Sequence, residues 1–224
     1  MAAAHIKSLR TFQSEGPYLL AGWCNGGTVA YEMARQLHAA GQKVELLVLM
    51  DPDPPGHLRS VRIVISRIGD LMQMDQAKQF DWFLSLRHVY RWLRYSRDRQ
   101  RQDLAPLGRD ERIEHKYRRD GVDATPPKPD SIVPMVGVLR QDWLGAYDWI
   151  ASVYVPRPYP GKVTLFWASE EPALRAGWSK MPHAAEQEIH VVPGTHTTCR
   201  TDYLQDLAEH LRTCLEKAQA TASP

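Results

Sequence analysis

A cysteine lies between two glycines where a short apolar run gives way to a helix-forming segment. The residues are Gly22-Trp23-Cys24-Asn25-Gly26, preceded by Tyr18-Leu19-Leu20-Ala21. This G-x-C-x-G pattern is that of a nucleophile elbow, in which a sharp strand-to-helix turn exposes the reactive atom at its apex, here a thiol instead of the usual hydroxyl. We expect glycines on both sides of the nucleophile because side chains there would collide. The alternative interpretation of Cys24 is an inert, buried strand cysteine.

A thiol nucleophile needs a base that takes its proton and an acid that orients the base. His196 is the best base among nine histidines, because it lies in a loop directly after a late predicted strand and before the terminal helix. Asp51 is the first choice of acid, because it follows the strand after the Cys24 helix and so shares the carboxyl edge of the sheet. Taken alone, Asp51 would be interpreted as a turn residue before proline. The alternative acids are Glu170 or Glu171, at the end of the next strand, and Asp53.

Hydrophobic periodicity predicts the elements that position these residues. Short apolar runs predict strands that are buried on both faces, and apolar residues three or four apart predict helices. Strand, helix and strand between residues 18 and 50 form a βαβ unit, which indicates an α/β fold with a mostly parallel sheet. The predicted strands are 18–23, 44–50, 162–168 and 188–192, and the predicted helices around them are 2–14, 25–40 and a final helix from Tyr203.

The pattern changes between residues 57 and 155, where no strand is predicted. Helices are expected at 60–70, 75–96, 108–120 and 134–152, so this region is interpreted as a helical lid inserted into the α/β core. The expected organisation is therefore 1–56 and 156–217 as the two parts of the core, 57–155 as the lid, and 218–224 as a disordered tail. Three arginines of the lid, Arg87, Arg91 and Arg94, form a stripe that could meet an acidic partner. The alternative is a solvated helix face.

Composition excludes several classes of protein. The 224 residues are 43% hydrophobic and 24% charged with a net charge of +2, as in an ordinary globular protein without a strong electrostatic partner. The apolar runs are too short to span a bilayer, and no signal-peptide pattern is present, so a cytoplasmic protein is expected. Cys24, Cys199 and Cys214 lack C-x-x-C spacing, which argues against a disulfide framework or a zinc site. Cys199 and Cys214 are interpreted as a helix-end residue and a small hydrophobe.

The segment from Gly16 to Leu37, which contains the elbow, closely resembles the thioesterase domains of nonribosomal peptide and polyketide synthases. Those domains have an α/β-hydrolase fold with a helical lid, and they cleave acyl groups from the phosphopantetheine arm of a carrier protein. In that family the acid follows the strand after the nucleophile helix, as Asp51 does. The histidine lies in a Pro-Gly-x-His segment before the last helix, which matches Pro193-Gly194-Thr195-His196. The resemblance covers the whole chain and is weak only across the lid.

This resemblance implies that Cys24 attacks an acyl or peptidyl thioester, that His196 transfers the proton, and that Asp51 orients His196. The backbone N–H of Asn25 would stabilise the oxyanion. No metal or redox cofactor is implied, and the expected partner is an acyl or peptidyl carrier protein. Carrier proteins of this kind are usually acidic, which makes the three lid arginines candidate contacts. Because the usual nucleophile is serine, a cysteine acyl-enzyme would remain a thioester, which favours transfer, cyclisation or aminolysis alongside hydrolysis.

Compared with that family, the chain begins late. Family members carry opening strands and a Gly-rich loop, which supplies another oxyanion-hole amide, before the first helix predicted here. We therefore expect a fragment, a mis-set start, or a chain completed by another polypeptide. The alternative function is a truncated, non-catalytic remnant that binds a carrier protein or a partner chain. Nucleic-acid binding by the basic lid is a more distant alternative, because the sequence shows no aromatic-basic motif of a known module.

Overall fold

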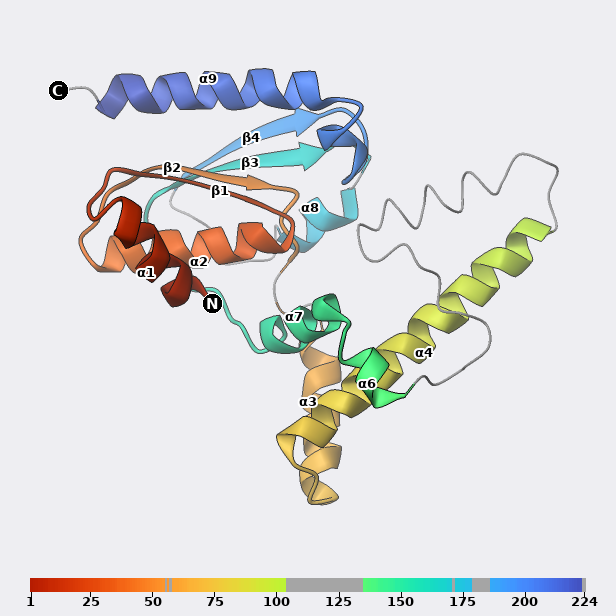
Figure 1. Ribbon diagram of the computed structural model, residues 1–224. Helices are drawn as coiled ribbons and strands as arrows, with labels where there is room; N and C mark the ends of the chain where they lie inside the picture. The colour runs from red at the N-terminus through yellow and green to blue at the C-terminus, as the bar shows by residue number, and fades with distance from the viewer. Residues whose placement is uncertain (55, 57, 104–134, 171, 179–185, 223–224) are drawn as a thin grey trace. The chain divides into compact units, whose positions relative to one another are not determined.

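The computed structural model describes residues 1–54, 56, 58–103, 135–170, 172–178 and 186–222 (Figure 1). The chain divides into two compact units. The first, called the α/β unit below, is formed by Met1–Pro55 together with Pro156–Pro224. The second, the helical unit, is formed by Gly56–Val155. The lid function expected for the helical unit stays a prediction.

A four-stranded, fully parallel sheet forms the centre of the α/β unit, with the strand order β1-β2-β3-β4. The register of the first pair runs from Leu19 beside Leu46 to Trp23 beside Met50. The predicted α/β fold with a parallel sheet is confirmed, and the last strand begins two residues earlier than expected. The strands are β1 (Tyr18–Trp23), β2 (Val44–Met50), β3 (Lys162–Ala168) and β4 (Glu186–Val192).

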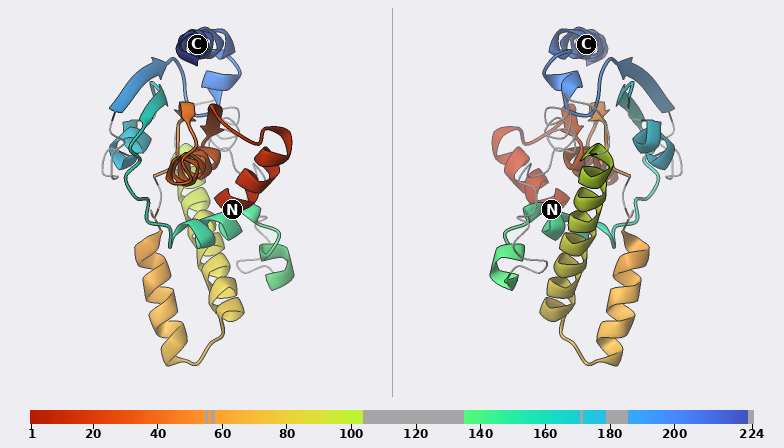
Figure 2. Two further views of the ribbon diagram at one scale, coloured as in Figure 1. Left: turned by 90° about the vertical axis from the view of Figure 1, so that its left-hand side faces the viewer. Right: turned by 90° about the vertical axis from the view of Figure 1, so that its right-hand side faces the viewer.

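Helices cover both faces of this sheet (Figures 1 and 2). On one face lie α1 (Ala2–Phe12) and α2 (Asn25–Ala39), whose apolar stripes pack in one cluster with buried side chains of β1, β2 and β3. On the other face, α9 (Leu204–Ala222) packs on β2 and β4 through a second cluster, which includes Val48, Phe166 and Leu207. The inner strands β2 and β3 are mainly apolar, as expected for strands covered on both faces. The prediction is wrong for the edge strands: Leu19 and Ala21 of β1 are exposed, and β4 is polar in its first half and largely exposed.

Two helical segments of the α/β unit differ from the expectation. α9 continues to Ala222, so the predicted disordered tail from residue 218 is wrong for its first part. Ala218 is buried, so the helix is still packed against the rest of the protein at the point where the disordered tail was predicted to begin. The helix α8 (Pro172–Trp178) was not predicted, because seven residues are too short for a clear period. Its last residue, Trp178, is buried in an edge-to-face contact with Tyr31.

The helical unit contains α3 (Arg59–Leu71), α4 (Gln76–Asp103), α6 (Val136–Leu139) and α7 (Trp143–Ala151). These helices enclose a separate core, so this unit has its own hydrophobic centre. The single helix predicted for 134–152 is wrong, because α6 ends at Leu139 and Asp142 begins α7 as its N-cap, accepting a hydrogen bond from the Gly145 N–H. The helix predicted for 108–120 lies outside the described residues. The core residues are Ile65, Phe83, Leu84, Leu139 and Trp149.

Within the described part of the chain, each helix is either too short or too polar to cross a lipid bilayer.

Candidate functional site

Cys24 occupies the strand-to-helix turn that its sequence context predicts. β1 ends at Trp23 and α2 begins at Asn25, and Cys24 between them has φ 53° and ψ −125°. A non-glycine residue adopts this region only when its surroundings force it to. Here the Cys24 N–H donates to the Met50 carbonyl at 2.9 Å, and the Cys24 carbonyl accepts from the Gly27 N–H at 2.9 Å. The turn is therefore held from the neighbouring strand on one side and from the first turn of α2 on the other.

The glycines around this turn have different roles. A Cβ atom on Gly22 would lie 2.2 Å from the carbonyl oxygen of Gly26, which no side chain could tolerate. A Cβ atom on Gly27 would lie 2.9 Å from the Cβ atom of Pro52. A Cβ atom on Gly26 would meet no other atom within 4 Å. The prediction that side chains would collide at both flanking positions is therefore right for Gly22 and wrong for Gly26, and Gly27 is the second glycine that close packing requires.

Asp51 and His196 form a buried pair at the carboxyl edge of the sheet. Asp51 directly follows β2 and is only 2% exposed. Its Oδ1 atom accepts a hydrogen bond from the Ala168 N–H at 2.8 Å, and its Oδ2 atom lies 3.3 Å from Nδ1 of His196. Because an ionised carboxylate can only accept hydrogen bonds, Nδ1 carries the hydrogen in this contact. The other ring nitrogen, Nε2, is then the basic atom of His196.

The loop that carries His196 is held by its own side chains. Gly194 has φ 93°, which allows the chain to turn sharply after β4. The Thr195 N–H donates to Oγ1 of Thr198 at 2.7 Å, and the Thr198 N–H donates to Oγ1 of Thr195 at 3.2 Å. All of these residues are buried. This closed turn presents His196 at the end of β4 with little conformational freedom.

Trp23 is a site residue that the sequence analysis did not identify. Its ring stacks on the His196 ring with a centroid distance of 4.2 Å and an angle of 26°. The guanidinium of Arg200 lies 3.8 Å from the centroid of the Trp23 ring. The neighbour of the nucleophile in sequence thus supports the histidine in space. Only the pairing of distant strands creates this contact, so no local signal could have revealed it.

The thiol of Cys24 interacts with Asp53 rather than with His196. Within the described residues, Sγ lies 3.6 Å from Oδ2 of Asp53 and 3.7 Å from Oδ1 of Asn25, and it makes no hydrogen bond to His196. Burial, followed by the negative charge of Asp53, raises the pKa of Cys24 to about 12, although the backbone N–H of Asn25 acts in the opposite direction. At neutral pH the nucleophile is therefore a protonated thiol, and its attack needs a base.

The structure distinguishes among the candidate acids. Asp51 contacts His196, whereas Asp53 contacts Cys24. Glu170 is exposed, and its backbone N–H, not its carboxylate, interacts with the His196 loop through the Gly194 carbonyl at 3.0 Å. Glu171 lies outside the described residues.

The lid arginines do not form a free basic stripe. Arg87 lies on α4 with its side chain only 13% exposed, and it is paired with Asp142 and, at 3.1 Å, with Asp148. Arg91 is 3.8 Å from the same Asp142 carboxylate. These pairs join α4 to the segment around α7, so the charge of Arg87 is neutralised inside the helical unit. This geometry argues against both a solvated face and a carrier-protein contact at Arg87. The side chain of Arg94 lies outside the described residues.

The parallel sheet, the elbow after β1 and the Asp–His pair at the same edge are features of the α/β-hydrolase fold. A family model described as a thioesterase domain matches residues 1–69. The thioesterase domain of NocB, solved in covalent complex with a fluorophosphonate nocardicin G analogue, superimposes with a TM-score of 0.55 at 26% identity. That match covers 96% of this chain and 73% of the NocB domain.

Relatives of known sequence point to multidomain synthases. The chain is 30% identical over 209 residues to a non-reducing polyketide synthase of Pseudevernia furfuracea, a match that covers 88% of this chain and 9% of that protein. It is 52% identical over 54 residues to a dimodular nonribosomal peptide synthase of Bacillus subtilis (strain 168), covering 24% of this chain and 2% of that protein. The chain is thus similar to a part of each of these synthases, and it spans less than a tenth of the length of these two relatives.

Proposed function

We propose that this chain accepts an acyl or peptidyl group from the phosphopantetheine thioester of a carrier protein onto Cys24 and then releases it. The observation that carries the proposal is the Asp51–His196 pair, with 3.3 Å between Oδ2 and Nδ1, at the sheet edge where Cys24 occupies a strained elbow. A buried acid, an oriented imidazole and a thiol at the carboxyl edge of one sheet are the parts of a nucleophilic acyl-transfer site. The relationship to synthase thioesterase domains supports the same class of substrate.

The first half-reaction begins at the thiol. Nε2 of His196 takes the thiol proton as the sulfur of Cys24 bonds to the thioester carbonyl carbon, and the charge moves to the carbonyl oxygen. In this proposal the backbone N–H of Asn25, at the start of α2, stabilises that oxyanion. When the tetrahedral intermediate collapses, the bond to the phosphopantetheine sulfur breaks and His196 returns the proton to that sulfur. Asp51 stays ionised and stabilises the transient imidazolium.

The second half-reaction decides the product. Water, an amine or a hydroxyl of the acyl chain attacks the Cys24 thioester while His196 accepts the proton of the incoming nucleophile. The bond between the acyl carbon and the Cys24 sulfur then breaks, and His196 returns the proton to that sulfur. The acyl-enzyme is a thioester, as is the substrate, so the group keeps its reactivity towards amines and internal nucleophiles. We therefore propose that transfer, cyclisation or aminolysis competes with hydrolysis. A Cys24→Ser variant with an unchanged product distribution would exclude this part of the proposal.

The Cys24 thiol must leave Asp53 before it can react. It donates its hydrogen to Asp53, and its pKa of about 12 means that it is protonated at neutral pH. We propose that substrate binding rotates the thiol towards Nε2 of His196, because the substrate carbonyl must approach Sγ. A specific observation therefore favours the second candidate function, a non-catalytic domain that binds a carrier protein: within the described residues, the thiol makes no hydrogen bond to the histidine.

Mass spectrometry with an acyl-pantetheine thioester separates the two functions. The proposal predicts a one-to-one acyl adduct on Cys24, formed slowly in a His196→Ala variant and not at all in a Cys24→Ala variant. Cys199, whose pKa is raised to about 11 by burial, and the buried Cys214 are internal controls, because peptide mapping should find them unmodified. A folded wild-type chain that forms no adduct, but still binds the holo carrier protein, would establish the non-catalytic function.

A further inference from the structure

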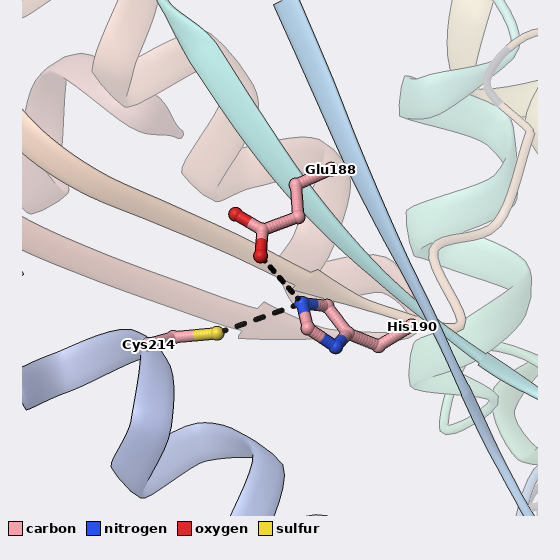
Figure 3. A group of neighbouring side chains, drawn as sticks. All are labelled: Glu188, His190 and Cys214. Atoms are coloured by element: carbon pink, nitrogen blue, oxygen red, sulfur yellow. Dashed lines mark hydrogen bonds and ion pairs between the residues drawn. The ribbon is translucent and has the colours of Figure 1, made fainter. Parts of the chain in front are cut away.

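Three side chains that could ligate a metal converge on the α9 face of the sheet, and none of them belongs to the proposed acyl-transfer site. Glu188 and His190 are two positions apart on β4, so their side chains point to the same face of the strand. Cys214 projects from α9 towards them, as Figure 3 shows. Their ligand atoms all lie within 4.8 Å of one another. A carboxylate, an imidazole and a thiol are all ligands that zinc accepts.

The hydrogen-bonding pattern of this cluster argues against a second catalytic unit. A catalytic Cys–His–acid arrangement uses the two ring nitrogens for different partners. Here Nε2 of His190 contacts both partners: Oε1 of Glu188 at 3.1 Å and Sγ of Cys214 at 3.7 Å. All three groups thus direct a donor atom at one point, which is what a metal ion requires.

These distances are close to those around a tetrahedral zinc ion. With Zn–N and Zn–O bonds near 2.0–2.1 Å and a Zn–S bond near 2.3 Å, the nitrogen and oxygen lie about 3.3 Å apart and the sulfur and nitrogen about 3.6 Å apart. The corresponding distances in the protein are 3.1 Å for His190–Glu188 and 3.7 Å for Cys214–His190. The carboxylate oxygen and the sulfur lie within 4.8 Å of each other, against about 3.6 Å around such an ion.

Neighbouring residues hold the cluster in place. The ring of Phe166, the partner of His190 in the sheet register, stacks on the imidazole with a centroid distance of 4.8 Å and an angle of 14°. Cys214 is only 3% exposed. A cavity of about 290 Å³ is lined by Glu188 and Cys214, together with Lys162 and Lys217.

Two lysines interact with the same carboxylate. The Lys162 ammonium lies 2.9 Å from Oε2 of Glu188. The Lys217 ammonium lies 3.5 Å from Oε1, the oxygen that faces His190. A metal ion on Oε1 would displace Lys217, whose side chain is 64% exposed, while Lys162 could keep its place on the other oxygen.

We propose that Glu188, His190 and Cys214 form a zinc site, with the fourth coordination position taken by water or an external ligand. On binding, the Cys214 thiol loses its proton to the solvent, and the sulfur bonds to the metal as thiolate. The ion fastens α9 to β4, on the two sides of the connection that carries His196. The site therefore stabilises the part of the fold that positions the acyl-transfer residues. Its existence does not depend on the proposed function.

Cobalt titration of the metal-free full chain tests the site. Co²⁺ replaces zinc in tetrahedral sites and shows a thiolate-to-cobalt charge-transfer band only when a cysteine is a ligand. We expect this band to saturate at one equivalent, to disappear on addition of Zn²⁺, and to be absent in Cys214→Ser. The matched control Cys199→Ser, which replaces another buried cysteine of the same apolar cluster, should keep the full band. Folding of each variant is checked by circular dichroism in the presence of a chelator.

Two further variants keep the proposal testable if Cys214→Ser does not fold. His190→Gln should keep the fold and lose at least tenfold in cobalt affinity, because a ligand is removed. Lys217→Met should bind several-fold more tightly, because it removes a cation that competes for Oε1 of Glu188. Zinc at about a hundred times Kd should raise the wild-type Tm by roughly 5–10 °C. The proposal is overturned if no charge-transfer band forms, if the band survives in Cys214→Ser, or if His190→Gln binds as tightly as wild type.

Discussion

Replacing Asp53 by asparagine is expected to make the thiol of Cys24 more reactive. The carboxylate lies 3.6 Å from Sγ, and its negative charge is, after burial, the largest cause of the raised pKa of about 12. Removing this charge stabilises the thiolate, so the pKa falls. Because burial is unchanged, the pKa should stay above the ordinary value of 9.0.

The size of the effect follows from the charge and its distance. A like charge this close shifts a pKa by about 1–2 units, which increases the thiolate fraction at neutral pH by about 10- to 100-fold. The intrinsic nucleophilicity of a thiolate falls with its pKa, with a Brønsted coefficient of about 0.4–0.5. The net expectation is a rise of about 3- to 10-fold in the alkylation rate of Cys24.

The assay is the rate of iodoacetamide modification of the Cys24 peptide between pH 7 and 10, followed by mass spectrometry. Asp53→Glu, which keeps the charge, and Glu170→Gln, which removes an exposed carboxylate elsewhere on the α/β unit, are the controls and should react as wild type does. An unchanged or slower rate in Asp53→Asn would refute the reasoning. Such a result would mean that Cys24 is already an ion-paired thiolate, whose reactivity does not depend on Asp53.

Three further predictions concern the positioning of the site and the helical unit. Asp51→Asn should keep the fold but lower the rate of acyl-enzyme formation by roughly 10³- to 10⁴-fold, because an amide N–H facing the histidine favours the wrong tautomer. Rapid-quench mass spectrometry measures this rate, and a loss below tenfold would contradict the prediction. Gly22→Ala should abolish folding or lower the Tm by more than 10 °C, because the new Cβ atom would push the strand end away from the Gly26 carbonyl. Gly26→Ala, where the Cβ atom meets nothing, should shift the Tm by only a few degrees. Arg87→Met should lower the free energy of unfolding in urea by about 3 kcal/mol, because it leaves Asp142 and Asp148 without this partner. Arg91→Met should cost under 1 kcal/mol. Equal effects of the two substitutions would argue against the buried pair.

The parts of this protein that follow local rules could be predicted from the sequence. β1, β2 and β3 have the predicted bounds, because short apolar runs flanked by glycine, proline or aspartate leave few alternatives for a buried strand. The turn at Cys24 was also predictable, since the glycine spacing and the change from strand to helix pattern lie within a few residues. Asp51 and His196 were found by their position after strands, because parallel strands bring their carboxyl ends to one edge.

What only the tertiary structure decided depends on contacts between residues far apart in the chain. The Cys24–Asp53 contact and the stacking of Trp23 on His196 both lie at the carboxyl edge of the sheet. Neither residue type nor spacing in the sequence predicts which of the side chains at this edge contact each other. The prediction that Arg87 belongs to an exposed stripe of arginines was wrong for the same reason. Helical periodicity shows which residues share a face but not what that face packs against.

Cys214 shows this division most clearly. In the sequence it is a small apolar residue on an amphipathic helix, without the spacing of a metal motif. In the fold it lies 3.7 Å from a histidine 24 positions earlier, which has a glutamate beside it on the same strand. The sequence by itself determined that a helix would pack here on a sheet. The crossing of that helix over β4 decided that its thiol meets an imidazole and a carboxylate, because convergence of ligands depends on the register between elements and not on the pattern within one of them.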